Sequence, residues 1–88
     1  MFGQDIQYVH LKFRKDFYYV MYDTFGSDVN TGLRKIDGGE YYEASVKVSV
    51  GKQFLGWLFS MNGKVEAVDP KIREMMLSNI EELRNTYK

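Results

Sequence analysis

The fold is decided by residues 40–50, which read Glu-Tyr-Tyr-Glu-Ala-Ser-Val-Lys-Val-Ser-Val. Apolar and polar side chains alternate from Tyr42 to Val50, so one side of an extended chain is apolar and the other is polar. This period of two predicts a β-strand that covers a core with one face. The triplet Asp37-Gly38-Gly39 before it predicts a tight reversal, because glycine adopts the positive φ angles that hairpin turns need. We therefore expect an antiparallel partner strand over Val29–Ile36.

The sequence before this hairpin predicts one strand and one helix. Ile6–Arg14 alternates in the same way and predicts a second half-buried strand. From Asp16 the apolar residues recur every three or four positions, which predicts a helix of about ten residues. Asp16 is placed to cap the start of that helix, and Gly26 is placed to end it.

Three further elements are predicted after residue 50. The spacing of apolar residues from Lys52 to Met61 predicts a helix that Asn62-Gly63 ends. Lys64–Val68 predicts a short strand. Asp69-Pro70 predicts the start of a last helix, because Asp caps a first turn and Pro lacks only an N–H that has no helical partner there. Apolar residues then continue at helical spacing through a helix roughly 25 Å long: Ile72, Met75, Met76, Ile80, Leu83 and Tyr87.

The resulting order is strand, helix, strand, strand, helix, strand, helix, which indicates an α+β domain. Its first six elements match the ferredoxin-like βαββαβ sandwich, in which two helices cover one face of a four-stranded antiparallel sheet. The seventh element is an additional C-terminal helix. Since 88 residues suffice for one domain, we expect a single α+β regulatory and association domain over residues 6–88, with 1–5 as linker residues.

The amino-acid composition excludes several classes of function. Twelve Lys and Arg balance twelve Asp and Glu, so the chain lacks the net positive charge of a typical nucleic-acid module. The absence of cysteine excludes thiol nucleophiles and cysteine zinc sites, and a single histidine does not supply the usual metal cluster. No nucleophile, acid–base pair or phosphate loop is recognisable, so we expect a protein that is not an enzyme and binds no cofactor. No apolar stretch suffices for a membrane span and no signal region opens the sequence, so we expect a soluble, cytoplasmic protein without a membrane partner.

The outward face of the predicted sheet is the first candidate site. On two neighbouring strands, the residues between the apolar positions combine aromatic and basic side chains. Such a face is solvated, covered by the last helix, or used for a partner or ligand. We expect His10 to be a surface or interface residue, because no Ser, Asp or Glu partner lies near it in sequence. The candidate partner or ligand face consists of Tyr8, His10, Lys12, Arg14, Tyr41 and Lys47.

A second candidate site is a set of association contacts around Trp57. Helical spacing places Trp57 roughly opposite Phe54, so we expect it to reach beyond the core to a subunit or domain contact, where large aromatic residues are enriched. Met61 and Arg73 complete the candidate association contacts. The alternative for the methionines is that they fill the core, which is their commoner role at helical spacing.

The second half of the chain carries a family resemblance. An alternating valine strand is followed by Phe54-Leu-Gly-Trp-Leu-Phe-Ser-Met-Asn-Gly63, by Lys64-Val-Glu-Ala-Val-Asp-Pro70, and by Ile72-Arg73-Glu74 at the start of a helix. This order and spacing resemble the C-terminal extension domain of WYL-domain transcriptional regulators, in which a WLLSFGxxVEVLEP-type stretch precedes an LRE helix start. The sequence departs at Ala67-Val68-Asp69, where the family more often has a bulkier hydrophobic residue and a Glu. The elements of the first half agree in order, so the resemblance covers nearly the whole chain.

The resemblance implies that the chain is a piece of a bacterial transcriptional regulator. In such regulators an N-terminal helix-turn-helix binds DNA and a central WYL domain senses a ligand or nucleic acid. The extension contributes to dimer contacts and relays the state of the sensor. The implied partners are the protein's own WYL and helix-turn-helix domains and a second copy in a homodimer, with DNA bound only by a domain that this chain lacks.

Two other functions remain open on the residues. One is a small-ligand-binding ferredoxin-like regulatory module, although the Gly-rich turn of such modules is replaced here by Arg14-Lys15-Asp16. The other is contact with single-stranded nucleic acid through the exposed sheet face, against which the neutral total charge and Glu43 weigh.

Overall fold

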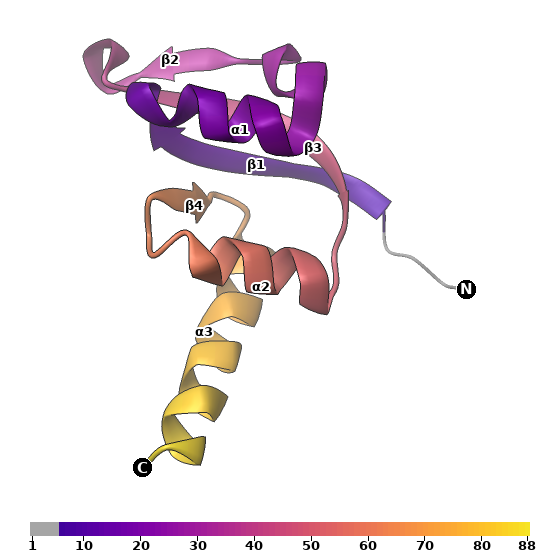
Figure 1. Ribbon diagram of the computed structural model, residues 1–88, viewed down its shortest axis with the longest axis vertical. Coiled ribbons are helices and arrows are strands. Elements are labelled where there is room, and N and C mark those ends of the chain that lie inside the picture. Colours follow the sequence, from indigo (N-terminus) through magenta and orange to yellow (C-terminus); the bar gives the residue numbers. More distant parts are fainter. Residues whose placement is uncertain (1–5) are drawn as a thin grey trace.

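A computed structural model describes residues 6–88 as an α+β domain with a four-stranded antiparallel sheet and three α-helices (Figure 1). The linker predicted over residues 1–5 lies outside the described residues. The strands are β1 (Ile6–Arg14), β2 (Arg34–Ile36), β3 (Tyr41–Ser49) and β4 (Val65–Ala67), and the helices are α1 (Tyr18–Phe25), α2 (Lys52–Ser60) and α3 (Pro70–Thr86). The order of strands and α-helices is the predicted one. In space the strands lie in the order β2-β3-β1-β4, with every neighbouring pair antiparallel.

The core lies between one face of this sheet and the helices α1 and α2. Alternate residues of the central strands are opposite one another, as in the pairs Val9↔Val46 and Leu11↔Ala44. In Figure 1, α1 crosses in front of β1 and β3. Each large apolar side chain in this layer contributes about 1.5–3 kcal/mol through burial. The buried residues are Val9, Leu11, Phe13, Met21, Val29, Ala44, Val46, Phe54, Leu55, Leu58, Val65, Ala67 and Ile72.

The turn before β3 is the predicted one, but the strand before that turn is shorter than predicted. Asp37, Gly38 and Gly39 have φ angles of 52°, 69° and 91°, which explains the two glycines. The strand predicted over Val29–Ile36 is wrong in its first half, because only Arg34–Ile36 pairs with β3. A 3₁₀ turn over Gly26–Asn30 instead carries Val29 into the core, where it is 0% exposed.

The start of α1 also differs from the prediction. A 3₁₀ turn over Lys15–Phe17 precedes the helix, and Asp16 makes no capping bond. The Asp16 carboxylate lies instead 3.5 Å from the Arg14 Nε. The Lys15 N–H donates to the Glu40 carbonyl oxygen at 3.1 Å, so the entry to α1 is tied to the start of β3. Gly26, with a φ of 68°, ends α1 as predicted.

Helix α2 follows the sequence pattern closely. It packs Phe54, Leu55 and Leu58 into the core. It ends where Asn62 and Gly63 adopt φ angles of 54° and 81°, the left-handed conformation that closes helices.

Helix α3 begins at Pro70 with Asp69 in the N-cap position, as predicted, but the Asp69 side chain makes no capping hydrogen bond. The Asp69 carboxylate reaches across to β1, as described below. From its first turns α3 extends past α2 and away from the sheet (Figure 1), and only Ile72 of this helix is buried. None of the helices within residues 6–88 combines the length and apolar character that crossing a bilayer requires.

Candidate functional site

The structure brings the six residues of the first candidate site onto one face of the sheet. β1 and β3 pair Tyr8 with Lys47 and Arg14 with Tyr41, and these positions alternate with the buried ones. We call this surface the polar face, made by Tyr8, His10, Lys12, Arg14, Tyr41 and Lys47. α3 does not cover it, since Tyr8, His10, Arg14 and Lys47 are all exposed.

Tyr41 organises the basic end of the polar face. The Lys12 Nζ lies 4.8 Å from the centre of the Tyr41 ring, and the Arg14 Cζ lies 5.8 Å from it. These are cation–π distances. Hydrogen bonding to Tyr41, and then the charge of Asp16, raise the pKa of Arg14 above its ordinary value. Tyr41 therefore has two cationic side chains beside its ring.

The cations of the polar face, and Arg34 on the neighbouring strand β2, lie beside acidic groups. The Lys12 Nζ is 3.2 Å from the Asp37 Oδ2, and the Arg34 Nη2 is 3.0 Å from the Glu43 Oε1. With Arg14 beside Asp16, three of the basic groups have a carboxylate within ion-pair distance. Such exposed pairs add little stability, because water screens both charges, but they weaken the positive field that would attract phosphate.

His10 has a partner that its sequence neighbourhood did not indicate. Its main-chain N–H donates to the Asp69 Oδ2 at 2.8 Å, and its Nδ1 lies 3.0 Å from the Asp69 Oδ1. The Val68 N–H donates to the His10 carbonyl oxygen at 2.9 Å. The carboxylate thus extends the β1–β4 ladder by one residue past the end of β4. The pair joins β1 to the start of α3, and the local sequence holds no sign of it because the two residues are 59 positions apart.

The three predicted association contacts each make an intramolecular contact. The Trp57 ring lies 5.1 Å from that of Phe25, edge to face, and is stacked 6.2 Å from that of Phe54. The prediction that Trp57 and Phe54 lie on opposite sides of the helix is wrong, because residues three apart are neighbours on a helix surface. Met61 is half-buried against the core, as are Met75 and Met76.

Arg73 connects α3 to β4. Its Nη1 donates to the Glu66 Oε2 at 2.6 Å and to the Ala67 carbonyl oxygen at 2.9 Å. The roles of Trp57, Met61 and Arg73 in association stay predictions.

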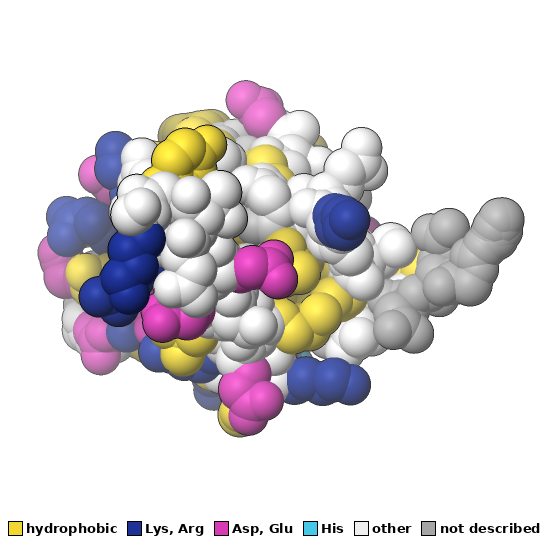
Figure 2. Space-filling view, turned by 90° about the horizontal axis from the view of Figure 1, so that it is seen from below, with side chains coloured by type: hydrophobic (Ala, Val, Ile, Leu, Met, Phe, Trp, Pro, Cys, Tyr) yellow, Lys and Arg dark blue, Asp and Glu magenta, His cyan; other side chains and the backbone are white. Residues whose placement is uncertain are grey.

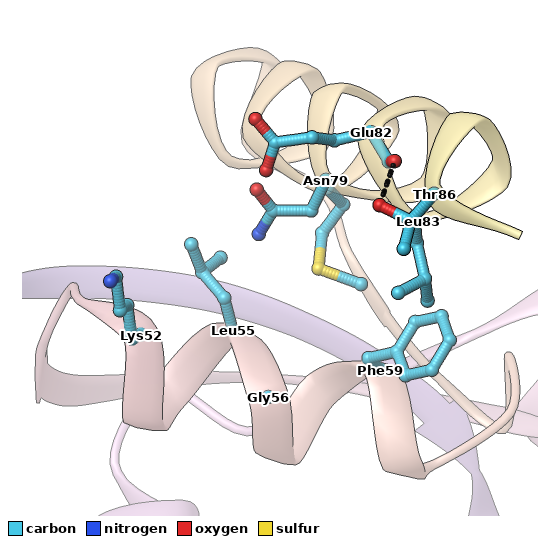
Figure 3. A pocket seen from close by; sticks show the side chains of 9 residues that line it. Lys52, Leu55, Gly56, Phe59, Asn79, Glu82, Leu83 and Thr86 are labelled. Atoms are coloured by element: carbon cyan, nitrogen blue, oxygen red, sulfur yellow. Dashed lines mark hydrogen bonds between the residues drawn. The ribbon is translucent and has the colours of Figure 1, made fainter.

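A groove between α2 and α3 is a hollow that the sequence did not indicate (Figure 3). It has a volume of about 260 Å³. Leu83 and Phe59 point toward one another across it, and Lys52 and Glu82 stand at its rim (Figure 3). We call it the α2–α3 groove; it is lined by Lys52, Leu55, Gly56, Phe59, Met76, Asn79, Glu82, Leu83 and Thr86. Helical spacing identified the apolar stripe of α3, but only the angle at which α3 leaves the sheet keeps this part of it open.

A second hollow, lined mostly by aromatic side chains, lies near the start of α1. Its volume is about 310 Å³, and it is lined by Lys15, Tyr18, Tyr19, Leu33 and Tyr42. The Tyr18 hydroxyl donates to the Asn30 Oδ1 at 2.5 Å, and the Tyr18 ring contacts that of Tyr42 edge to face. These contacts fix one wall of the hollow.

Within residues 6–88 no three His, Asp or Glu side chains are grouped to hold a metal ion. No protein-family model matches the chain, and no curated protein or solved structure matches it either.

Proposed function

We propose that the chain is the non-catalytic regulatory and association domain of a bacterial WYL-family transcriptional regulator. In this proposal it acts in the cytoplasm, pairs with a second copy, and relays the state of a sensing domain to a separate helix-turn-helix domain that binds DNA. The motif order from Phe54 to Glu74 supports the family.

The fold proposed with this function is a ferredoxin-like sandwich with α3 added to it. The strand order β2-β3-β1-β4 supports it, because two crossovers through α1 and α2 leave β1 and β3 in the centre of such a sheet. Both helices contribute to a single core cluster, as two right-handed crossovers would place them on one face.

The observation that carries the association role is the apolar surface left open along α3 and α2. Ile80 is 43% exposed, Leu83 is 45% exposed and Phe59 is 48% exposed. In the view of Figure 2, taken from below that of Figure 1, hydrophobic side chains reach the surface between acidic and basic ones. Contiguous apolar surface with a charged surround is typical of a protein contact site. By contrast, no polar or charged side chain of residues 6–88 is buried, whereas catalytic groups are commonly sheltered from water.

The test joins the chain to a helix-turn-helix domain that represses a reporter only as a dimer and has lost its own dimerisation region. We expect the fusion to restore repression, because two copies of the chain would bring two DNA-binding domains to one operator. A fusion to an unrelated monomeric domain of similar size is the control. Sedimentation of the chain alone, from about 1 to 200 μM, gives the affinity directly. The proposal would be contradicted by a fusion that does not restore repression together with a chain that stays monomeric in sedimentation.

The alternative function is the binding of a small ligand, and the aromatic hollow beside Lys15 favours it. Tyrosine rings with one cation suit an aromatic acid or a nucleotide base with an anionic group. A thermal-shift screen of amino acids and nucleotides tests it, since a ligand bound only by the folded state raises the melting temperature. Loss of that shift in Tyr19→Ala, with Tyr8→Ala as the control because Tyr8 is exposed on the opposite face of the sheet, would assign the ligand to this hollow.

A further inference from the structure

The distal half of α3 leaves the body of the domain with its apolar side chains uncovered. Ile80 is 43% exposed and Leu83 is 45% exposed, although both lie on the same side of the helix. Tyr87, which caps the C-terminus of α3 and whose N–H donates to the Leu83 carbonyl oxygen, is 83% exposed. A helical segment of this length without tertiary packing is marginal in water. A partner surface that covers these apolar side chains would therefore also stabilise the helix itself.

The exposed stripe has the spacing of a helix-pairing surface. Met76, Ile80, Leu83 and Tyr87 are separated by four, three and four residues, which is the alternation of the a and d positions of a coiled coil. We call these four residues the α3 seam. Met76 also lines the α2–α3 groove, so the seam begins at the groove and continues to Tyr87, the C-cap residue of the helix.

The α3 seam is complementary to itself in the antiparallel direction. With a two-fold axis midway between Ile80 and Leu83, each of these residues is opposite the other in the second copy, and Met76 is opposite Tyr87. A symmetric contact requires this reciprocity, because every pair must occur twice.

The charges of α3 are compatible with that symmetry. In a symmetric pair a charge on the axis meets its own copy, and like charges there are repulsive. Glu81 and Glu82 are the acidic residues closest to the axis, but each lies roughly 130° around the helix from the centre of the seam. On the groove side the residues nearest the seam, Asn79 and Thr86, are neutral, and the two charged lining residues, Lys52 and Glu82, carry opposite signs.

We infer that two copies of this chain associate through antiparallel α3 helices, with Tyr87 of each copy packed against Met76 and the mouth of the α2–α3 groove of the other. The inference rests on the proposed association function and names its surface and its partner. The partner is a second copy, since in the antiparallel direction every residue of the seam is opposite another residue of the same seam.

The first experiment measures the dissociation constant by sedimentation velocity for the unaltered chain and for Ile80→Glu and Leu83→Glu. Each variant places a charge near the axis, and we expect each to raise the dissociation constant at least tenfold. Val20→Glu is the matched control, because Val20 is 37% exposed but lies on α1. Circular dichroism of every variant checks that it is folded, and Glu suits an exposed helical position.

The second experiment tests the direction of the helices and uses the absence of cysteine from the chain. A mixture of Met76→Cys and Tyr87→Cys chains is expected to form a disulfide-linked heterodimer on mild oxidation. Tyr87→Cys alone is expected not to cross-link, because in an antiparallel pair the two positions are roughly 16 Å apart along the helix axis, counted at 1.5 Å a residue.

The outcomes separate this inference from the function on which it rests. If Ile80→Glu and Leu83→Glu leave the dissociation constant of the dimer unchanged, the α3 seam is not the contact and the two copies associate through another surface. Efficient cross-linking of Tyr87→Cys alone overturns the antiparallel arrangement. A chain that stays monomeric overturns the inference, whereas the proposed function fails only if the repressor fusion is silent as well.

Discussion

His10 and Asp69 join the middle of the sheet to the start of α3 through two contacts with one carboxylate. Oδ2 accepts the main-chain N–H of His10 at 2.8 Å, and Oδ1 lies 3.0 Å from the ring Nδ1. Because Asp69 immediately precedes Pro70, this contact sets where α3 leaves the sheet. The direction of α3, and with it the opening of the α2–α3 groove, depends on a pairing between residues far apart in the chain.

We expect Asp69→Ala to lower the free energy of unfolding by about 1–2 kcal/mol, because it removes both acceptors. His10→Ala should cost less, since the main-chain N–H of residue 10 keeps its acceptor. Urea unfolding of the two variants measures the difference. Equal losses would mean that the ring contact, and not the main-chain bond, supplies the stability.

Trp57→Ala is expected to destabilise the fold by about 2–4 kcal/mol, because its ring fills the space between Phe25 and Phe54. Trp57→Phe keeps an aromatic ring there and should cost less than half as much. Thermal unfolding followed by circular dichroism gives both values. If the predicted association contact also holds, Trp57→Phe will weaken the dimer while the fold remains intact. A Trp57→Ala variant as stable as the unaltered chain would contradict the packing role.

Two glycines provide an opposed pair of variants. A Cβ added at Gly56 or at Gly63 meets no atom within 4 Å, so neither substitution creates a clash. Gly56 lies inside α2, and Gly56→Ala should therefore stabilise the fold by about 0.5–1 kcal/mol. Gly63 has a φ of 81°, and Gly63→Ala should destabilise it by about 1–2 kcal/mol. The denaturant midpoint of each variant is compared with that of the unaltered chain. Shifts in the same direction for both variants would show that backbone conformation is not the deciding difference.

Single-stranded oligonucleotides are expected to bind the polar face weakly, with no saturation below about 100 μM protein at 150 mM salt. The reason is that Asp37 and Glu43 lie beside Lys12 and Arg34. The double variant Asp37→Asn and Glu43→Gln keeps the size of both side chains and frees the two cations, so it should bind more tightly and with a steeper salt dependence. Fluorescence anisotropy of a labelled oligonucleotide measures both. Tight binding by the unaltered chain would instead support the nucleic-acid function.

Amide hydrogen exchange should show the distal half of α3 as the least protected helix in dilute protein. Protection at Ile80 and Leu83 is expected to rise with protein concentration, since a second copy would cover the same residues. The amides of Leu55 and Leu58 in α2 serve as the internal control and should not respond. Concentration-independent exchange throughout α3 would contradict the paired helix.

Much of the architecture could be predicted because it depends on local patterns. The alternation in Ile6–Arg14 and in Tyr41–Ser49 reflects strands with one buried face, and Asn62-Gly63 ends α2 by the backbone conformation these residues tolerate. The six residues of the polar face were grouped correctly on one surface for the same reason, since a strand sends every second side chain to one side. The failures occurred where a tertiary contact competed with the local preference. The carboxylates of Asp16 and Asp69 pair with distant or neighbouring side chains in place of capping, and Val29 is buried through a 3₁₀ turn.

The amino-acid sequence by itself determined the order of the elements and the apolar stripe of α3, because both follow from periodicities within a few residues of one another. The tertiary structure decided that this stripe is buried at Ile72, half-buried at Met75 and Met76, and open from Ile80 onward. Whether an apolar helix face meets the core depends on the direction in which the helix leaves the sheet. That direction is set by contacts between segments far apart in the chain, from His10 to Asp69 and from Arg73 to the main chain of β4.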